Sequence, residues 1–265
     1  MKLGFNILNP SYFEAALDLM LARKGIRPIR VGFSMYGEDQ GPNWSLYDRM
    51  HRAMVARSIP HLILLGYVPD AWVDAGGWWG RWMDEYFKPC VTKYFGPLCL
   101  GFQIWNEPLT LEWSSRYTAS QIFSKTSDYI DFLWPCRLTT SPEIPLVAAA
   151  PMNILQSGDG FKQAVEMARR LPDGVEMALH IYGPNFTKLA WQSLWLPKGA
   201  WVTEFGDGQR WRQPDTLTWT GWVIDKILKP KHVFWYHWLG HDNHAALRYG
   251  DSFGPLEESP AIWRL

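Results

Sequence analysis

LGFQIWNEP, residues Leu100–Pro108, is the stretch of this sequence that decides the fold. Its first part, Leu100–Asn106, is a short and mainly apolar run, which is typical of a strand buried in a sheet. The run then changes abruptly to Glu107 and Pro108, and a helix is expected near Ala119–Trp134. The stretch therefore predicts one β/α unit with polar side chains where the strand ends.

The same unit recurs along the chain. The other expected strands are Leu3–Leu8, Pro28–Ser34, His61–Tyr67, Ile144–Ala150, Val175–Tyr182, Ala200–Phe205 and Val233–Trp238. The other expected helices start at Ser11 and Ser45, each with an acidic residue in the capping-box position, and lie near Gly80–Tyr94, Gly160–Arg170, Lys188–Trp195 and Asp215–Leu228. Eight strands that alternate with helices predict a parallel sheet, and eight units in one chain predict its closure into a barrel.

The predicted fold class is therefore α/β, a single (β/α)8 TIM barrel with short loops that spans residues 1–265 as one catalytic domain. No Ser/Gly-rich linker or charge run divides the chain, and the tail from about His241 is expected to be a loop. A doubly wound open sheet is the alternative. It would require a glycine-rich phosphate loop after an early strand, but the first strand is followed by NPSYFE.

The composition narrows the function class. Basic and acidic residues are balanced at 26 each, so the net charge is zero and gives no electrostatic basis for a nucleic-acid partner. The 17 tryptophans are unusual, and a tryptophan ring can pack on the apolar face of a sugar. Tryptophan also fills cores, so we expect most of these residues to be structural and a few to bind carbohydrate.

Targeting and cofactor signals are weak. The three cysteines show no metal-ligand spacing, and an odd number argues against a complete disulfide framework. The apolar stretch after Lys2 is too short for a signal peptide, and no run reaches transmembrane length. We expect a soluble monomer that does not bind membranes, either cytoplasmic or a secreted protein trimmed of its leader, with no metal and no organic cofactor.

The expected strand ends carry the chemistry, because the active sites of such barrels lie at the carboxyl ends of the strands. The polar and aromatic residues expected there are Arg30, Asn106, Glu107, His180, Tyr182, Glu204, His237 and Trp238. Two carboxylates, Glu107 and Glu204, therefore emerge from strands four and seven on opposite sides of the barrel mouth. Glycoside hydrolysis requires such a pair on either side of the bond that is cleaved.

With these residues in place, the chain resembles clan A of the glycoside hydrolases. WNEP at Trp105–Pro108 is similar to the acid/base motif of the clan, and TEFG at Thr203–Gly206 resembles its nucleophile motif. The resemblance covers the whole chain in order and spacing. It implies a (β/α)8 barrel that hydrolyses β-glycosidic bonds with retention of configuration.

The resemblance also implies a role for each residue at the barrel mouth. Glu107 would be the acid/base and Glu204 the nucleophile, with Arg30 and Tyr182 supporting the nucleophile and His180 nearby. Asn106 would bind the 2-hydroxyl of the sugar, and Trp238 would form the floor of the subsite. The family five cellulases and mannanases usually carry a histidine at the end of strand three, where this chain reads Leu65-Gly66-Tyr67. The resemblance therefore reaches the clan and no family within it.

Four tryptophans, Trp44, Trp72, Trp78 and Trp79, are expected in loops after strands two and three. Because loop positions offer no core to fill, stacking of Trp78 and Trp79 on sugar is as reasonable an interpretation as packing. His180 is open in the same way, between a packed histidine and a site residue. HDNH at 241–244 lacks a recognised ligand geometry, and we interpret it as a solvated loop.

The predicted reaction is a double displacement in which ionised Glu204 attacks the anomeric carbon and protonated Glu107 assists the leaving group. The expected substrate is an oligo- or polysaccharide, and the tryptophan-rich loops favour an endo-acting β-glycanase. Three alternatives stay open: an exo-acting β-glycosidase, a non-catalytic carbohydrate-binding barrel, and a metal-dependent barrel hydrolase. The last would need histidine and aspartate ligands at strand ends, and the first strand ends in Asn6-Ile7-Leu8-Asn9.

Overall fold

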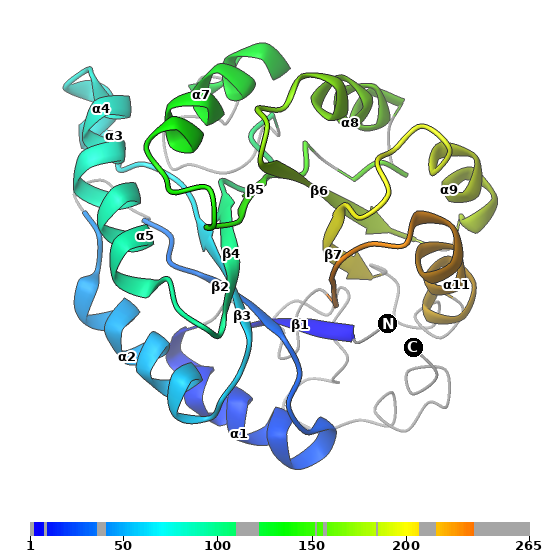
Figure 1. Cartoon of the computed structure of the whole chain (residues 1–265), viewed down its shortest axis with the longest axis horizontal. Helices are drawn as coiled ribbons and strands as arrows, with labels where there is room; N and C mark the ends of the chain where they lie inside the picture. The colour runs from blue at the N-terminus through cyan, green and yellow to red at the C-terminus, as the bar shows by residue number, and fades with distance from the viewer. Residues whose placement is uncertain are drawn as a thin grey trace.

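A computed structural model describes residues 3–7, 10–35, 41–109, 122–151, 153–155, 158–183, 185–206 and 216–235. Eight parallel strands close into a barrel in chain order, and helices surround it (Figure 1). The strands are β1 (Leu3–Ile7), β2 (Ile29–Gly32), β3 (His61–Leu65), β4 (Cys99–Ile104), β5 (Leu146–Ala148), β6 (Val175–Tyr182), β7 (Trp201–Gly206) and β8 (Val233–Trp235). The structure thus confirms the (β/α)8 barrel, whereas the single-domain extent of 1–265 stays a prediction.

The helical segments lie between consecutive strands. They are η1 (Pro10–Tyr12), α1 (Phe13–Lys24), α2 (Trp44–Ala56), α3 (Asp70–Asp74), α4 (Trp78–Trp82), η2 (Met83–Phe87), α5 (Lys88–Tyr94), α7 (Thr126–Leu138), α8 (Gly158–Arg170), α9 (Phe186–Gln192), η4 (Thr216–Thr220), α11 (Gly221–Val223) and η5 (Ile224–Leu228). None of the helices in the described ranges is long and apolar enough to cross a membrane.

Two predicted helix starts were wrong. The side chain of Asn43 caps α2 by accepting from the backbone N–H of Leu46, so Ser45 lies inside the helix. Ser11 lies in the 3-10 turn η1 that precedes α1. In both places the first helical turn begins earlier than the capping-box pattern predicted. The pattern alone does not fix the first residue of a helix.

Alternation along each strand places the core. Ile63 and Leu65 of β3 pack with the helices in the larger hydrophobic cluster, whereas Leu62 belongs to a smaller cluster with Trp201 and Phe234. Because successive side chains of a strand point to opposite faces, the smaller cluster fills the barrel interior. Inward-pointing positions that do not fill this interior are available for a site.

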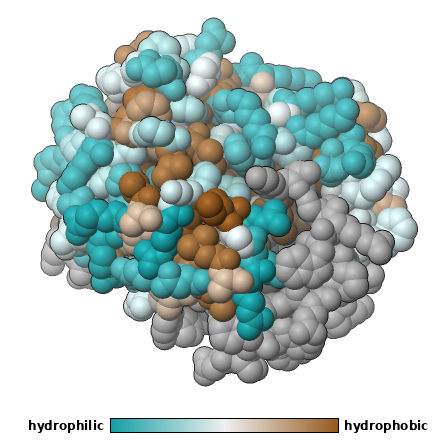
Figure 2. Space-filling model, turned by 60° about the horizontal axis from the view of Figure 1, so that its bottom comes forward, coloured by the Kyte–Doolittle hydropathy of each residue, from teal (hydrophilic) through white to brown (hydrophobic). Residues whose placement is uncertain are grey.

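Hydrophobic residues are exposed at several places on the described part of the surface. Figure 2 shows one face, on which hydrophobic residues gather near the centre among hydrophilic ones. Several large aromatic side chains on or beside the outer helices are also exposed, among them Trp191, Trp219 and Trp222 in helical segments and Trp195 in the turn after α9.

Candidate active site

Polar residues occupy inward positions on four strands. Asn6, Arg30, Gln103 and His180 are each flanked by neighbours in the larger core, such as Ile29 and Val31 beside Arg30. By alternation, these four polar side chains therefore point into the barrel. All four are buried, and a buried polar side chain needs hydrogen-bond partners to offset its lost hydration.

A bulge turns Glu204 toward the same space. Leu179 pairs with Val202 and His180 pairs with Glu204, so Thr203 is an extra residue between two rungs of the ladder. Strict alternation from the core residue Val202 would point Glu204 at the helices. The extra residue reverses this alternation, and the side chain of Glu204 enters the barrel, where it is 5% exposed.

Arg30 is the centre of the site. Its Nη1 donates to Glu204 Oε1 at 2.8 Å and to Asn6 Oδ1 at 3.0 Å. Its Nε donates to Gln103 Oε1 at 2.8 Å, and its Nη2 donates to Asn106 Oδ1 at 2.6 Å. A guanidinium that is fully buried is thus bound on all of its nitrogens, which fixes both its position and the carboxylate beside it.

The surroundings of Glu204 favour its ionised form. Burial by itself would raise the pKa of this carboxyl group, but the charges of His180 and Arg30 and hydrogen bonds from Tyr182 and Arg30 outweigh it. The net effect is a pKa below the ordinary value for glutamate. The hydroxyl of Tyr182 donates to Glu204 Oε2, and His180 Nδ1 lies 3.5 Å from the same oxygen. Glu204 is therefore held as a carboxylate in a fixed orientation.

Glu107 reaches the site through an unusual backbone. Trp105 and Glu107 both have positive φ angles, of 69° and 42°, so the chain turns sharply as it leaves β4. Such conformations cost about 1–2 kcal/mol each in residues other than glycine, and surrounding contacts must maintain them. Gln103 Nε2 donates to the carbonyl of Trp105 at 3.0 Å, and the N–H of Trp105 donates to the carbonyl of Leu65.

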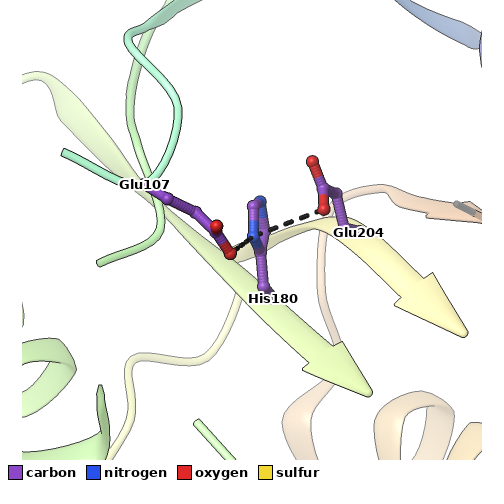
Figure 3. A group of neighbouring side chains, drawn as sticks. All are labelled: Glu107, His180 and Glu204. Carbon is purple, nitrogen blue, oxygen red and sulfur yellow. Dashed lines mark hydrogen bonds and ion pairs between the residues drawn. The ribbon is translucent and has the colours of Figure 1, made fainter. Parts of the chain in front are cut away.

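His180 lies between the two glutamates. Its Nδ1 is 2.7 Å from Glu107 Oε1, and one ligand atom each of Glu107, His180 and Glu204 lies within 4.8 Å of the others (Figure 3). Figure 3 shows the two carboxylates converging from opposite sides of the imidazole. The two carboxyl groups and the imidazole therefore form one compact cluster.

The structure brings six of the predicted site residues together, namely Arg30, Asn106, Glu107, His180, Tyr182 and Glu204. His180 is buried and also contacts both glutamates, and its role as a site residue stays a prediction. Trp238, for which the resemblance implies a place at the floor of the subsite, lies outside the described residues, as does the HDNH segment.

The four tryptophans predicted in loops are helical instead. Trp44 begins α2, Trp72 is buried in α3, and Trp78 and Trp79 begin α4. The ring of Trp78 packs 5.7–6.1 Å from rings of the aromatic core, whereas Trp79 packs on Phe132 and remains 38% exposed. Gly76 and Gly77 precede this helix, and Gly77 is its N-cap. Because paired glycines are typical of loops, they made the start of the helix hard to predict.

Three residues of the site network went unnoticed in the sequence. Asn6 and Gln103 hold Arg30, and Asn153 binds the backbone of Tyr182. A polar residue inside an otherwise apolar strand was the available signal for Asn6 and Gln103. Asn153 follows β5 without such a signal, and its role depends on a tertiary contact.

The cluster of Glu107, His180 and Glu204 has ligand types that a divalent cation could use. However, the guanidinium of Arg30 lies 2.8 Å from Glu204, and Tyr182 donates to the other oxygen of that carboxylate. A cation there would face a buried positive charge at close range. The donor set as it stands fits a metal poorly.

Known structures share this fold. Cel5A of Thermotoga maritima, solved with cellobiose, aligns with a TM-score of 0.65 and 10% identity over 98% of this chain and 97% of its own. The mannotriose complex of the Thermomonospora fusca β-mannanase aligns with a TM-score of 0.62 and 15% identity over 98% and 89%. A β-glucosidase from Exiguobacterium marinum aligns with a TM-score of 0.52 and 12% identity over 85% and 76%.

The sequence itself gives no such match. No protein-family profile matches it, and no curated protein matches it. At 10–15% identity, the structural likeness shows a shared barrel fold.

Proposed function

We propose that this protein is a retaining glycoside hydrolase that cleaves β-glycosidic bonds, with Glu204 as nucleophile and Glu107 as acid/base. The observation that carries the proposal is the closeness of the two glutamates, since one carboxylate oxygen of each lies within 4.8 Å of one of the other. Retaining enzymes hold their carboxyl groups about 5–5.5 Å apart, whereas inverting enzymes need about 6.5–9.5 Å to admit a water. The spacing supports direct attack by a carboxylate.

In the first step, Glu204 attacks the anomeric carbon and forms a glycosyl ester. The bond from that carbon to the leaving oxygen breaks, and Glu107 gives its proton to the oxygen. In the second step, Glu107 takes a proton from water, whose oxygen displaces Glu204 and restores the carboxylate. Glu204 begins as the anion because Arg30 and Tyr182 stabilise its charge.

Other residues orient the sugar and the acid. Asn106 accepts from Arg30 through Oδ1, which directs its amide N–H group toward a sugar hydroxyl, as the 2-hydroxyl role requires. His180 contacts Glu107 through Nδ1 and lies beside Glu204, so it can help to orient both carboxylates. Trp238 is proposed as the floor of the subsite from its sequence position alone.

The proposed substrate is an oligo- or polysaccharide, and endo action on a β-glycan is favoured. The supporting observation is that structural neighbours at 10–15% identity include an endoglucanase with cellobiose and a β-mannanase with mannotriose. The β-glucosidase neighbour keeps exo action as the alternative. A panel of aryl β-glycosides and soluble β-glucans, mannans and xylans would identify the sugar. We further propose that the protein acts as a monomer in solution.

Azide rescue tests the two assignments. In Glu107→Ala, an activated aryl β-glycoside should still form the glycosyl-enzyme, because a good leaving group needs little protonation. Azide needs no general base, so it should restore turnover and give the β-glycosyl azide. In Glu204→Ala, activity should fall by several orders of magnitude, and any rescue should give the α-azide.

The reverse stereochemistry would overturn the assignments. If the Glu204 variant gave the β-azide and the Glu107 variant gave the α-azide, the two roles would be exchanged. Absence of hydrolysis by the intact protein across the whole glycan panel would favour a non-catalytic carbohydrate-binding barrel. Binding of the same glycans, measured by calorimetry, would then identify that alternative.

Glu107, His180 and Glu204 are also residue types of a metal-dependent hydrolase, although the Arg30 guanidinium beside Glu204 makes them a poor cation site. Prolonged dialysis against EDTA separates the two proposals. The glycosidase mechanism predicts unchanged kcat after dialysis, because each step uses side chains alone. Loss of activity that Zn²⁺ or Mn²⁺ restores would favour the metal enzyme.

A further inference from the structure

The carboxyl end of β6 carries both His180 and Tyr182, yet strand β5 does not pair with this part of β6. β7 pairs with β6 from Ala178 as far as Tyr182. β5 pairs with β6 only from Val175 to Met177. The last residues of β6 therefore extend beyond β5, and His180 and Tyr182, which both contact Glu204, lie on this extension.

Asn153 takes the place of the missing strand. Its Oδ1 accepts from the backbone N–H of Tyr182 at 3.2 Å, and its Nδ2 donates to the carbonyl of the same residue at 3.5 Å. A primary amide has the donor and acceptor of a peptide group, so this side chain forms an extra rung of the sheet. Its backbone forms a parallel bridge with His180, and the N–H of Ile154 donates to the His180 carbonyl at 3.2 Å.

The segment that carries Asn153 is itself anchored. Asn153 Oδ1 also accepts from the N–H of Leu155 at 3.0 Å, which fixes the local turn. From α9, Gln192 Nε2 donates to the carbonyl of Ile154 at 3.1 Å, and Lys188 Nζ donates to that of Leu155 at 2.8 Å. The rung is thus tied to a helix and buried, with Asn153 8% exposed.

We propose that Asn153 is a positioning residue, which holds the end of β6 so that the Tyr182 hydroxyl meets the Glu204 carboxylate. The inference rests on the proposed glycosidase function for its kinetic readout. Without the rung, the N–H and carbonyl of Tyr182 would lose their two bonds to Asn153, while the pairing of β6 with β7 would remain. The hydroxyl would then sample positions away from Glu204 Oε2, and the nucleophile would lose part of its fixed orientation.

Three variants test the rung. Asn153→Ala removes both bonds to Tyr182, and we expect kcat on an aryl β-glycoside to fall about tenfold, with KM changing less than about twofold. Asn153→Asp keeps the acceptor for the Tyr182 N–H but loses the donor to the Tyr182 carbonyl, so it should recover part of the loss. Lys188→Met loosens the same segment on its α9 side without touching β6, and it should retain wild-type kcat. If Asp were as slow as Ala, or Lys188→Met as slow as either, the proposal would fail.

A double-mutant cycle distinguishes positioning from general destabilisation. Tyr182→Phe removes the hydroxyl through which Asn153 is proposed to act. In that background, Asn153→Ala should lower kcat by less than about twofold, because the two residues share one effect. Losses that multiply would show that Asn153 acts independently of the Tyr182 hydroxyl, and the proposal would be wrong.

A measurement independent of activity separates this inference from the function it rests on. Amide hydrogen exchange at Tyr182 should be faster in Asn153→Ala than in the wild type, with Asn153→Asp close to the wild type. If no glycoside is hydrolysed by the intact protein, the function fails while the exchange still reports on the rung. Equal exchange in all three proteins would overturn the rung itself.

Discussion

At the scale of single residues, the protonation state of Glu204 depends on a few donors. The Tyr182 hydroxyl is one of the groups that lower its pKa. Tyr182→Phe should therefore raise the pKa of Glu204, and the acidic limb of the kcat/KM profile should move to higher pH. The sign follows because Glu204, the proposed nucleophile, must be an anion to attack, and the anion is lost as pH falls through this pKa.

A distant tyrosine provides the control for this shift. Tyr94 donates to Asp48 on α2, away from the site, so Tyr94→Phe should leave the acidic limb in place. The measurement is kcat/KM against pH for both variants and the wild type. An unmoved limb in Tyr182→Phe would show that the tyrosine does not tune the nucleophile.

At the scale of elements, the first two residues of α4, Trp78 and Trp79, differ in exposure and packing. Trp79 is more exposed than Trp78, whose ring packs on Trp105, Phe123 and Phe132. Trp79→Ala should weaken oligosaccharide binding by about 1–3 kcal/mol if the ring stacks on sugar, by analogy with aromatic stacking on bases. Trp78→Ala should also lower the melting temperature. Unchanged affinity in both, with a lowered melting temperature, would identify them as packing residues.

Gly101 of β4 lies so close to the backbone of Pro145 that a side chain would not fit there. Gly101 has φ 151°, and a Cβ there would lie 2.8 Å from the carbonyl oxygen of Pro145. Gly101→Ala should lower the free energy of unfolding by about 1–3 kcal/mol, because the backbone of the next strand would have to move. Gly80 in α4 has no atom within 4 Å of its would-be Cβ, so Gly80→Ala should stabilise the helix by about 0.5–1 kcal/mol. Equal urea midpoints for the two variants would contradict this reading of β4.

At the scale of the whole molecule, a buried histidine contributes to the response to acid. Burial lowers the pKa of His61 from 6.5 to about 4, and its ring lies against that of His51. In the unfolded chain His61 would protonate near its ordinary pKa, so the unfolded state binds more protons between pH 6.5 and about 4. The protein should therefore lose about 3 kcal/mol of stability from this group as pH falls through that window.

His61→Leu removes the titrating group and leaves the carboxylates unchanged. The free energy of unfolding, measured in urea from pH 7 to pH 4, should therefore fall less steeply in the variant than in the wild type. Identical slopes would mean that the pKa of His61 is the same in the folded and the unfolded protein.

The parts of the molecule differed in how well the sequence predicted them. The order of strands was predictable because each is a short apolar run, and the ends of β4 and β7 were predictable because Glu107 and Glu204 interrupt such runs. The bulge at Thr203 was not, since one extra residue leaves no mark on hydropathy. The contacts of Asn6 and Asn153 join residues far apart in the chain, which no local pattern records.

The placement of Arg30 has a consequence for the synthesis of this chain. Its four partner side chains come from the first, fourth and seventh strands or their ends, and Glu204 is made 174 residues after it. A nascent chain still lacking β7 would have to bury an uncompensated guanidinium, at a cost of several kcal/mol. Half-barrels released from the ribosome should therefore stay open and sensitive to proteases, and protection should appear only once the segment containing Glu204 has emerged. The positive charge of Arg30, which stabilises the Glu204 carboxylate, thus also makes closure of a partial barrel energetically unfavourable.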